Sequence, residues 1–383
     1  MKYNNLDIVI GVPAFNEQTT IKDVISVLDG GLQKYYSKKR SLIILLDSNS
    51  EDETVKIFNS TRLSTPKLVI KNIEHGKGRN IINLLDFSIK NNAKCICMVD
   101  ADIKNIKKNW VFKLINPILN DNADFVTPIY KRGKFAGNIT NLICRPMLYG
   151  LCGLFVHQPI GGDFSFNTKY ATSLLNKIKS SKAYIKSIIY GFGIDMFMTC
   201  QCLSEGYKHQ EVDLGTKKDK PGLFHIDEVF RGECTSLFYA IASKDFVGAK
   251  YKKNISTKNF ISEAKPYLDG ELKKKLELSL ILIKKNKNKN KNKIYSELKM
   301  SELENKKQIT SQEFNGLLVK VAKLLQSKNV VNKADLFYII NLVRPYFHLR
   351  VCTYFKEIKG KKPREVEKKL IQSCRFIRNK MLK

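Results

Sequence analysis

The sequence lacks any long apolar segment. No stretch offers 18 consecutive apolar residues, and the longest uncharged stretch, residues 146–162, is interrupted by His157, Gln158 and Pro159. A membrane-spanning helix needs such a run. The N-terminus also has no apolar stretch of signal-peptide length before its first strand-like run. We therefore expect a cytoplasmic protein, and peripheral contact with the inner membrane surface stays open.

Proline and glycine are modest, at ten and 21 of 383 residues, which excludes collagen-like repetition and wholesale disorder. The nine cysteines form no C-x-x-C pair, so a small disulfide scaffold is excluded and reduced thiols are expected. The pairs Cys95/Cys97 and Cys200/Cys202 are too closely spaced for the usual zinc knuckles. The length suggests two domains, or one large domain with an appendage.

Acidic residues are few, with 36 Asp and Glu against 67 Lys and Arg, a net charge of +31. From Ile241 to Lys383 there are 35 basic and 13 acidic residues, so most of the excess lies in the C-terminal third. Such a field favours anionic partners. An anionic membrane surface ranks above nucleic acid here, because no nucleic-acid motif accompanies the charge and no aromatic residues interleave with the lysine run.

The first 130 residues alternate strand-like and helix-like patterns, with strands expected at 7–12, 41–46, 68–71 and 94–99 and helices between them. This order predicts an α/β fold with a mostly parallel sheet flanked by helices, whose ligand lies at the carboxyl ends of the strands. Residues 236–383 are expected to be basic and mainly helical. The tract Lys284–Lys293 (KKNKNKNKNK) has no apolar residue to bury, so we expect an exposed loop there.

Each of the four strand ends carries polar or special residues. Asp100 and Asp102 follow a buried strand, where paired carboxylates favour a hard cation such as Mg²⁺ or Mn²⁺; the alternative is a solvated turn with Asp102 capping a helix. Lys77, between two glycines, suits a phosphate contact or a simple surface turn. Glu17 and Asp47 suit a base or ribose, although taken singly a helix cap is favoured for each.

The segments VPAFNEQTTI, LLDSNSEDET, HGKGRN and VDADI, in this order, resemble the nucleotide-sugar-binding half of family 2-like glycosyltransferases with the GT-A (Rossmann-like) fold. The following segments GNIT, CRPML, QPIGGDF, YGFGID and VDLG resemble the glucosyl-3-phosphoglycerate synthase and mannosylglycerate synthase group. The resemblance covers about residues 7–220. It implies a GT-A domain over 1–235, with a nucleotide-sugar half (1–130) and an acceptor half (131–235), followed by the helical region 236–383.

The resemblance also implies roles for individual residues. Asp195 and Lys77 are the expected catalytic residues, with Asp195 binding hydroxyls and stabilising charge. The metal, Mg²⁺ or Mn²⁺, would be held by Asp102 and Asp219, with His225 as the alternative ligand. The expected nucleotide-sugar contacts are Pro13, Ala14, Phe15, Glu17, Asp47, Ser48, Lys77, Asp100, Ala101 and Asp102. The expected acceptor contacts are Asn138, Thr140, Gly162, Asp163 and Lys217.

Three positions depart from the family pattern. Asn138 stands where phosphoglycerate-using members have an arginine, and the neutral amide of asparagine cannot replace a charged guanidinium that binds phosphate with two N–H groups. Arg132, Lys134 and Arg145 are candidates to supply the missing positive charge. Asp163 stands where the family has glutamate. Asp219 stands at the position of a metal-binding histidine.

The leading hypothesis is therefore metal-dependent transfer of glucose or mannose from a nucleotide diphosphate sugar, of the UDP-glucose or GDP-mannose type, to a small anionic acceptor such as glycerate or phosphoglycerate, with retention. One alternative is a membrane-surface transferase that uses a polyprenyl phosphate. Another is a non-catalytic binding protein on a GT-A scaffold. No specific nucleic acid is expected, and a homodimer stays open.

Overall fold

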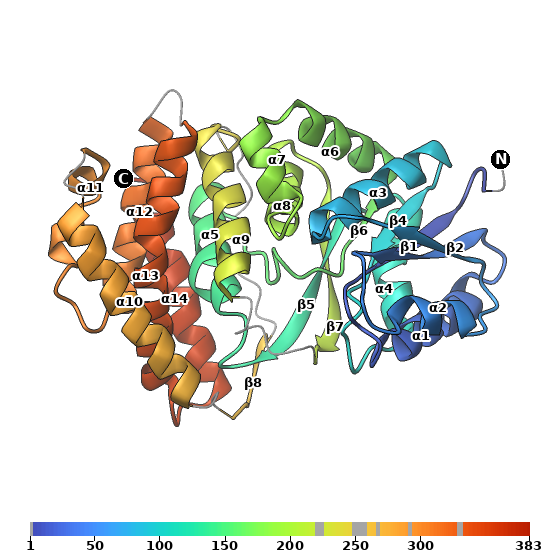
Figure 1. Ribbon diagram of the computed structural model, residues 1–383, viewed down its shortest axis with the longest axis horizontal. Helices are drawn as coiled ribbons and strands as arrows, with labels where there is room; N and C mark the ends of the chain where they lie inside the picture. Colours follow the sequence, from blue (N-terminus) through green and yellow to red (C-terminus); the bar gives the residue numbers. More distant parts are fainter. Residues whose placement is uncertain (1–2, 219–225, 247–258, 266–268, 290–292, 328–331) are drawn as a thin grey trace. The chain divides into compact units, whose positions relative to one another are not determined.

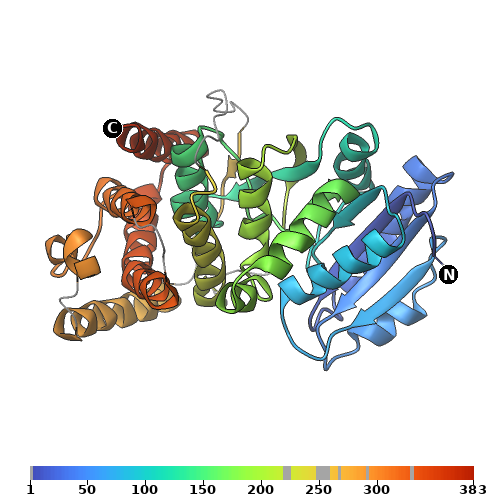
Figure 2. The same cartoon turned by 90° about the horizontal axis from the view of Figure 1, so that it is seen from above.

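The computed structural model describes residues 3–218, 226–246, 259–265, 269–289, 293–327 and 332–383 (Figures 1 and 2). The chain divides into two compact units. The first contains residues 1–130 and 157–236, and the second contains residues 131–156 and 237–383. This division differs from the expected domains, because residues 131–156, assigned above to the acceptor half, group with the C-terminal helices.

The first unit alternates strands and helices along the chain. Its elements are β1 (Ile8–Ala14), α1 (Ile21–Tyr36), β2 (Ser41–Asp47), α2 (Thr54–Ser60), β3 (Lys67–Lys71), α3 (Lys77–Lys90), β4 (Cys95–Met98), α4 (Lys108–Leu119), β5 (Phe125–Gly133), β6 (Ser165–Asn167), α6 (Thr168–Ser180), α7 (Ala183–Ile189), α8 (Ile194–Ser204), β7 (His209–Thr216) and α9 (Ile226–Ala242). The last residues of β5 and α9 belong to the second unit. The four strands expected in the first 100 residues are confirmed, with ends shifted by at most two residues.

Strand order in the sheet is β3-β2-β1-β4-β6-β5-β7. β1 pairs in parallel with β2 on one side and β4 on the other, and β2 pairs in parallel with β3. β6 is antiparallel to both β4 and β5. The sheet is therefore mixed and mostly parallel in its N-terminal half, as the sequence predicts. The carboxyl ends of β1, β2, β3 and β4 meet at one edge, which places the polar loops side by side.

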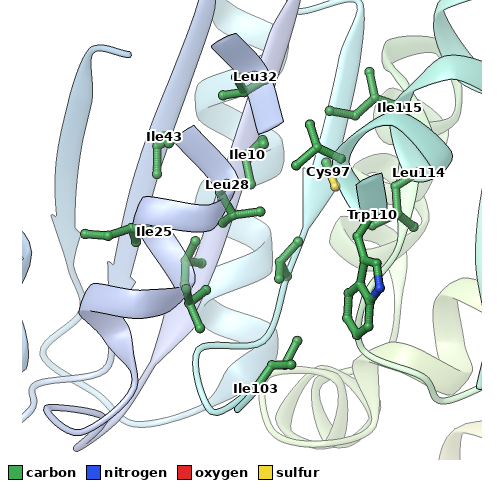
Figure 3. Packing of buried hydrophobic residues seen from close by; sticks show 14 of the residues in the cluster. Ile10, Ile25, Leu28, Leu32, Ile43, Cys97, Ile103, Trp110, Leu114 and Ile115 are labelled. Atoms are coloured by element: carbon green, nitrogen blue, oxygen red, sulfur yellow. The ribbon is translucent and has the colours of Figure 1, made fainter. Parts of the chain in front are cut away.

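Helices cover both faces of this sheet. Alternate residues of β1, among them Ile8, Ile10 and Val12, join the apolar sides of α1 and α4 in one buried cluster (Figure 3). On the other face α3 packs against β1 and β2, and α6 packs against α3. Side chains of neighbouring strand residues point to opposite faces, so a strand covered on both sides must be apolar throughout. This accounts for the continuous run IVIGVPA in β1.

The start of α3 is fixed by close backbone packing. A Cβ on Gly78 would lie 1.7 Å from the carbonyl oxygen of Ile189, and one on Gly76 would lie 2.3 Å from that of Tyr190. The amide of Gly78 donates to the carbonyl of Gly191 at 3.0 Å. The two glycines around Lys77 therefore allow the segment between α7 and α8 to pack closely against the start of α3. From the sequence alone, the same glycines suggest the close approach of a ligand.

The second unit is mainly helical. Its elements are a π-helical turn (Thr140–Cys144), α5 (Arg145–Cys152), β8 (Ile261–Ser262), α10 (Asp269–Lys289), α11 (Lys293–Glu297), a 3₁₀ turn (Met300–Glu302), α12 (Ser311–Ser327), α13 (Lys333–Ile358) and α14 (Pro363–Met381). α10 continues through Lys289, so the loop expected from Lys284 onward is wrong for residues 284–289. Lysine has a good helix propensity and can extend an existing helix while staying solvated; the side chains of Lys284 and Lys285 are exposed.

The second unit is held together by α14, which packs along α5 and α12. Gly150 of α5 leaves room for Ile377, whose side chain would lie 2.5 Å from an added Cβ. Arg145 is completely buried, donates to Asn141 at 2.7 Å and stacks 4.4 Å from the ring centroid of Phe260. The role of Arg145 in this unit is therefore structural.

All nine cysteines are free and buried, which agrees with the absence of a disulfide framework. In the described part of the chain no helix is long and apolar enough to cross a membrane.

Replacing Gly78 with alanine should lower the free energy of unfolding by about 1–3 kcal/mol, because a backbone carbonyl cannot move aside as a flexible side chain can. Gly316→Ala is the matched control, since this helical glycine has no atom within 4 Å of an added Cβ; it should be neutral or stabilising by up to about 1 kcal/mol. Urea denaturation of both variants measures the difference. Equal stabilities would contradict the proposed packing.

Candidate functional site

The loops after β1 and β2 form one surface. The backbone N–H of Ser48 donates to the carbonyl of Ala14 at 2.9 Å, and that of Asn16 donates to Oγ of Ser50 at 3.0 Å. The carboxylate of Asp47 accepts from the backbone of Ser50 at 3.2 Å. Asp47 therefore closes the turn after β2 and does not cap α2, which begins at Thr54.

An exposed aromatic pair stands beside this surface. The ring of Phe15 is 45% exposed and meets the ring of His75 edge to face, with centroids 4.7 Å apart. Pro13 and Glu17 are half-buried in the same loop, and the Glu17 carboxylate accepts from the Thr20 hydroxyl at 3.3 Å. A flat apolar ring next to carboxylate and backbone acceptors is a suitable surface for a heterocyclic base.

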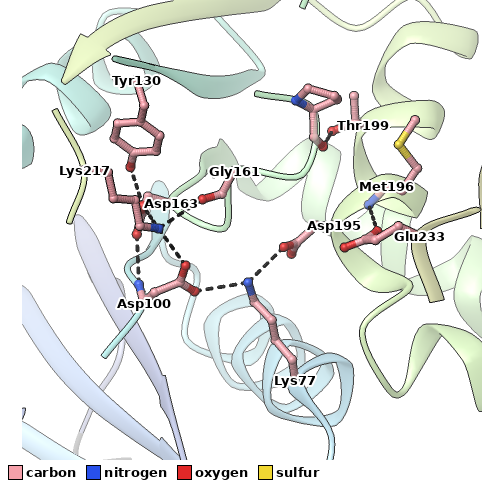
Figure 4. Close-up of polar contacts among 11 residues, drawn as sticks. Lys77, Asp100, Tyr130, Gly161, Asp163, Asp195, Met196, Thr199, Lys217 and Glu233 are labelled. Carbon is pink, nitrogen blue, oxygen red and sulfur yellow. Dashed lines mark hydrogen bonds and ion pairs between the residues drawn. The ribbon is translucent and has the colours of Figure 1, made fainter. Parts of the chain in front are cut away.

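Lys77 joins two carboxylates from different elements. Its Nζ lies 3.1 Å from Oδ1 of Asp100, which follows β4, and 2.9 Å from Oδ2 of Asp195 in the first turn of α8 (Figure 4). The backbone packing at Gly76 and Gly78 brings the start of α3 against the segment before α8, so the local fold delivers Lys77 to Asp195. The structure thus brings together both expected catalytic residues.

Lys217 binds the other side of Asp100. Its Nζ lies 2.8 Å from Oδ2 of Asp100, 2.7 Å from Oδ2 of Asp163 and 3.2 Å from the carbonyl of Gly161. The hydroxyl of Tyr130 also donates to Asp163 (Figure 4). The result is a chain of alternating charge, called here the ion chain, whose members are Asp195, Lys77, Asp100, Lys217 and Asp163.

Burial and charge act in opposite directions on these carboxylates. Burial raises the pKa of Asp100, but the ammonium groups of Lys217 and Lys77 outweigh it and lower that pKa. For Asp163, burial dominates over Lys217, and the charge of Asp100 adds to it, so the pKa rises to about 6. Burial lowers the pKa of Lys77 less than Asp100 and Asp195 raise it. Both lysines are thus paired cations.

Asp195 keeps one oxygen for another partner. Its Oδ2 binds Lys77, whereas its buried Oδ1 has no hydrogen-bond donor among the described residues. Nearby, the buried carboxyl of Glu233 in α9 accepts from the backbone N–H of Met196 at 2.9 Å and so holds the first turn of α8. Burial, followed by the charge of Asp195, raises the pKa of Glu233 well above its ordinary value.

Several expected residues take other positions. Asp102 lies half-buried in the turn after β4, and Asp219 and His225 lie outside the described residues. Asn138 and Thr140 are 7% and 4% exposed in the second unit, and the Lys134 ammonium is occupied by the Lys361 carbonyl and Glu263.

Lys217 corrects a further expectation. Its side chain is 1% exposed, against 17% for Lys77, so a direct contact with an acceptor phosphate does not fit its environment.

Acids at the ends of the strands are the candidate ligands for a divalent cation. Within the described ranges, no group of three or more His, Cys, Asp or Glu side chains is arranged to hold a metal ion. Both oxygens of Asp100 already bind ammonium groups. Asp102, half-buried in the turn after β4, is a hard oxygen ligand of the kind that suits Mg²⁺, an ion usually bound through one or two carboxylates with water and substrate phosphates.

Sequence reasoning missed Tyr130 and Glu233, and it did not foresee that Lys217 would neutralise acids. Tyr130 is the last buried residue of β5, and Glu233 lies in α9, which also contains Asp227, Glu228 and Arg231. No local sequence signal separates Glu233 from the other acids of its helix.

The fold and the acids and lysines at the strand ends are those expected of a glycosyltransferase domain of the GT-A class. Residues 9–189 match the model of the family Glycosyl transferase family 2, so a domain of this family occupies that part of the chain.

Two curated proteins and one solved structure illustrate the similarity. A glucosyl-3-phosphoglycerate synthase of Petrotoga mobilis is 29% identical over 184 residues, which cover 42% of this chain and 53% of that protein. The protein named "Probable glycosyltransferase YdaM" of Bacillus subtilis is 33% identical over 113 residues, covering 29% and 26%. The chain thus spans about half the length of the first relative and about a quarter of the second.

The solved structure is glucosyl-3-phosphoglycerate synthase from Mycobacterium tuberculosis in complex with Mg²⁺ and uridine diphosphate. It is 22% identical, with a TM-score of 0.50, and covers 61% of this chain and 79% of that one. At this identity the likeness supports the fold alone.

Substitution of Gly162 tests the close packing of its backbone against the Asp100 carboxylate. Gly162 has φ +81°, and an added Cβ would lie 2.2 Å from Oδ2 of Asp100. Gly162→Ala should displace this carboxylate from Lys217 and cost more than the roughly 1–2 kcal/mol of a left-handed alanine. Gly206→Ala is the control, because Gly206 has φ +73° and no neighbour within 4 Å of an added Cβ. Thermal unfolding compares the two, and an equal loss would contradict the contact.

Asp163 should make stability depend on pH. Its folded pKa, about 6, lies above its ordinary 3.8, so the folded protein binds this proton more tightly than the unfolded chain. The stabilising contribution is complete below about pH 4 and is lost as the pH rises through about 6. Asp163→Asn should remove this decline, about 1–3 kcal/mol between pH 4 and 6.5. Urea unfolding at several pH values measures it, and parallel profiles for both proteins would refute the assignment.

Proposed function

We propose that this protein transfers a hexose, glucose or mannose, from a nucleotide diphosphate sugar to a small anionic acceptor such as glycerate or phosphoglycerate, with retention. The ion chain at the carboxyl ends of the parallel strands carries the proposal, because it joins Lys77 and Asp100, which lie within the residues that match the family 2 model, to the ammonium of Lys217 and to Asp195, whose Oδ1 has no hydrogen-bond donor among the described residues. The relative from Petrotoga mobilis supports the acceptor class, since it is a glucosyl-3-phosphoglycerate synthase.

The donor would lie across the loops after β1, β2 and β4. Phe15 and the turn closed by Asp47 would hold the base and ribose, and Lys77 would face the diphosphate. As the sugar bond breaks, negative charge develops on the leaving diphosphate. A fixed ammonium in a water-poor site stabilises that charge most effectively, because it needs little reorganisation.

Asp195 would orient the reacting hydroxyl. Lys77 fixes Oδ2, and Oδ1 can accept a hydrogen bond from a sugar or acceptor hydroxyl. Glu233 holds the first turn of α8 and so sets the direction of this carboxylate. Lys217 and Asp163 act through Asp100, by fixing the carboxylate that positions Lys77, and are positioning residues in this scheme.

A bound Mg²⁺ or Mn²⁺ would supply a Lewis acid for the leaving diphosphate. Asp102 would hold it, with Asp219 or His225 as proposed further ligands. The protein's own part is to keep Asp100 paired with Lys77 and Lys217.

A screen of UDP-glucose and GDP-mannose against glycerate, 3-phosphoglycerate and a polyprenyl phosphate, with Mn²⁺, Mg²⁺ or EDTA, tests the proposal through release of the nucleotide diphosphate. Lys77→Met should lower kcat by about 10²–10³-fold with the active pair. Lys90→Met, an exposed lysine at the other end of α3 paired with Asp86, is the matched control and should keep full activity.

The outcomes separate the alternatives. Turnover with only the polyprenyl phosphate would replace the small acceptor by a lipid. Donor binding without turnover on any acceptor would favour the binding-protein alternative, and equal activity with and without EDTA would remove the metal requirement.

A further inference from the structure

The second unit contains a large cavity that the proposed reaction does not use. It has a volume of about 740 Å³ and lies between the end of β5, the segment that includes β8, and the first turns of α14. Figure 1 shows β8 beside the start of α14 in this unit. The cavity is lined by Lys131, Asn259, Ile261, Ser262, Lys362, Pro363, Arg364, Glu367, Lys368 and Ile371.

The lining is strongly positive. Four cationic side chains, Lys131, Lys362, Arg364 and Lys368, face a single carboxylate, Glu367. All four cations are exposed, and in the described part of the chain none of them forms an ion pair or hydrogen bond through its side chain. Other lysines of this unit are paired, for example Lys134 with Glu263 and Lys320 with Glu302. Repulsion among four unpaired cations is unfavourable unless an anion relieves it.

Glu367 does not neutralise this group. Its Oε1 accepts from the backbone N–H groups of Phe260 and Ile261, each at 2.8 Å, and the residue is 8% exposed. These bonds attach β8 to α14, while β8 pairs in parallel with the end of β5 at Arg132 and Gly133. The carboxylate of Glu367 therefore helps to form the wall of the cavity. The cations lie on or next to β5, β8 and α14, which these bonds hold together.

The lining also contains uncharged polar and apolar side chains that can contact a ligand. Ser262 and Asn259 can bind oxygens, and Ile261, Pro363 and Ile371 provide an apolar part of the wall. On α14, Arg364, Lys368 and Ile371 are spaced by four and three residues, so they share one side of the helix.

We propose that this cavity is a binding site for a phosphate-bearing anion, separate from the proposed donor site. The phosphate would lie among Lys131, Lys362, Arg364 and Lys368, with the carbon part of the ligand against Ile261 and Ile371. Two sources supply this chemistry, a free phosphorylated compound and the headgroup of an anionic phospholipid, and the experiment distinguishes them.

The test uses the full chain with Lys362→Glu and Lys368→Glu combined. The matched control combines Lys323→Glu and Lys356→Glu, two exposed helical lysines of the same unit outside the cavity, so that net charge changes equally. Both pairs are also made in a Lys77→Met background, which weakens anion binding at the donor site. Circular dichroism checks that every variant is folded.

Calorimetry with inorganic pyrophosphate forms one arm, and sedimentation with vesicles of phosphatidylglycerol or phosphatidylcholine forms the other. We expect the cavity pair to weaken binding at least 10-fold in one arm while the control pair changes it less than 2-fold. Loss of pyrophosphate binding indicates a free phosphorylated ligand. Loss confined to phosphatidylglycerol vesicles indicates a lipid headgroup.

Equal losses for the cavity and control pairs would reduce the effect to general charge and overturn the proposal. Unchanged binding in both arms would overturn it too. Neither arm measures sugar transfer, so failure here is independent of failure of the proposed function.

Discussion

The carboxylate of Asp100, whose side chain is only 23% exposed, must be neutralised, and the first unit is organised around that requirement. An unpaired charge in a protein interior costs several kcal/mol, so a second and a third element must bring cations to it. Lys77 comes from the start of α3 and Lys217 from the segment after β7. Each lysine then needs a further acid, Asp195 or Asp163. Five residues from distant parts of the sequence are thus mutually dependent, which fixes the floor of the site without a ligand.

Close backbone packing makes this ion chain attainable. Gly76 and Gly78 let the start of α3 contact the segment before α8, and Gly162 lets its loop pass next to Asp100. A side chain at any of these glycines would separate charges that must lie about 3 Å apart. The glycines of this unit therefore serve electrostatics indirectly, by allowing three backbone segments to meet.

The sequence predicts the parallel strands and their polar ends well, because a strand covered on both faces must be an apolar run and its end must return to solvent. Asp100 and Lys77 are predicted in this way, whereas Asp195 is expected only from the family resemblance, and the three lie together. The pairing of Lys217 with two acids was not predictable, since a lysine that follows a strand is equally compatible with solvent or a phosphate. The grouping of residues 131–156 with the C-terminal helices depends on tertiary contacts such as Gly150 with Ile377, which no local pattern reports. The sequence did not predict that α10 continues to Lys289. The Lys- and Asn-rich composition shows that these residues are solvated, but it does not show whether their backbone is helical.

The free, buried cysteines make local opening of the fold measurable through the rate at which their thiols are modified. Burial raises the pKa of the thiols of Cys95 and Cys97 in β4, of Cys202 in α8 and of Cys234 in α9. A protonated, inaccessible thiol neither attacks an alkylating reagent nor oxidises readily. Modification of these side chains therefore requires the sheet or the helices beside the ion chain to open, and its rate records how often they do.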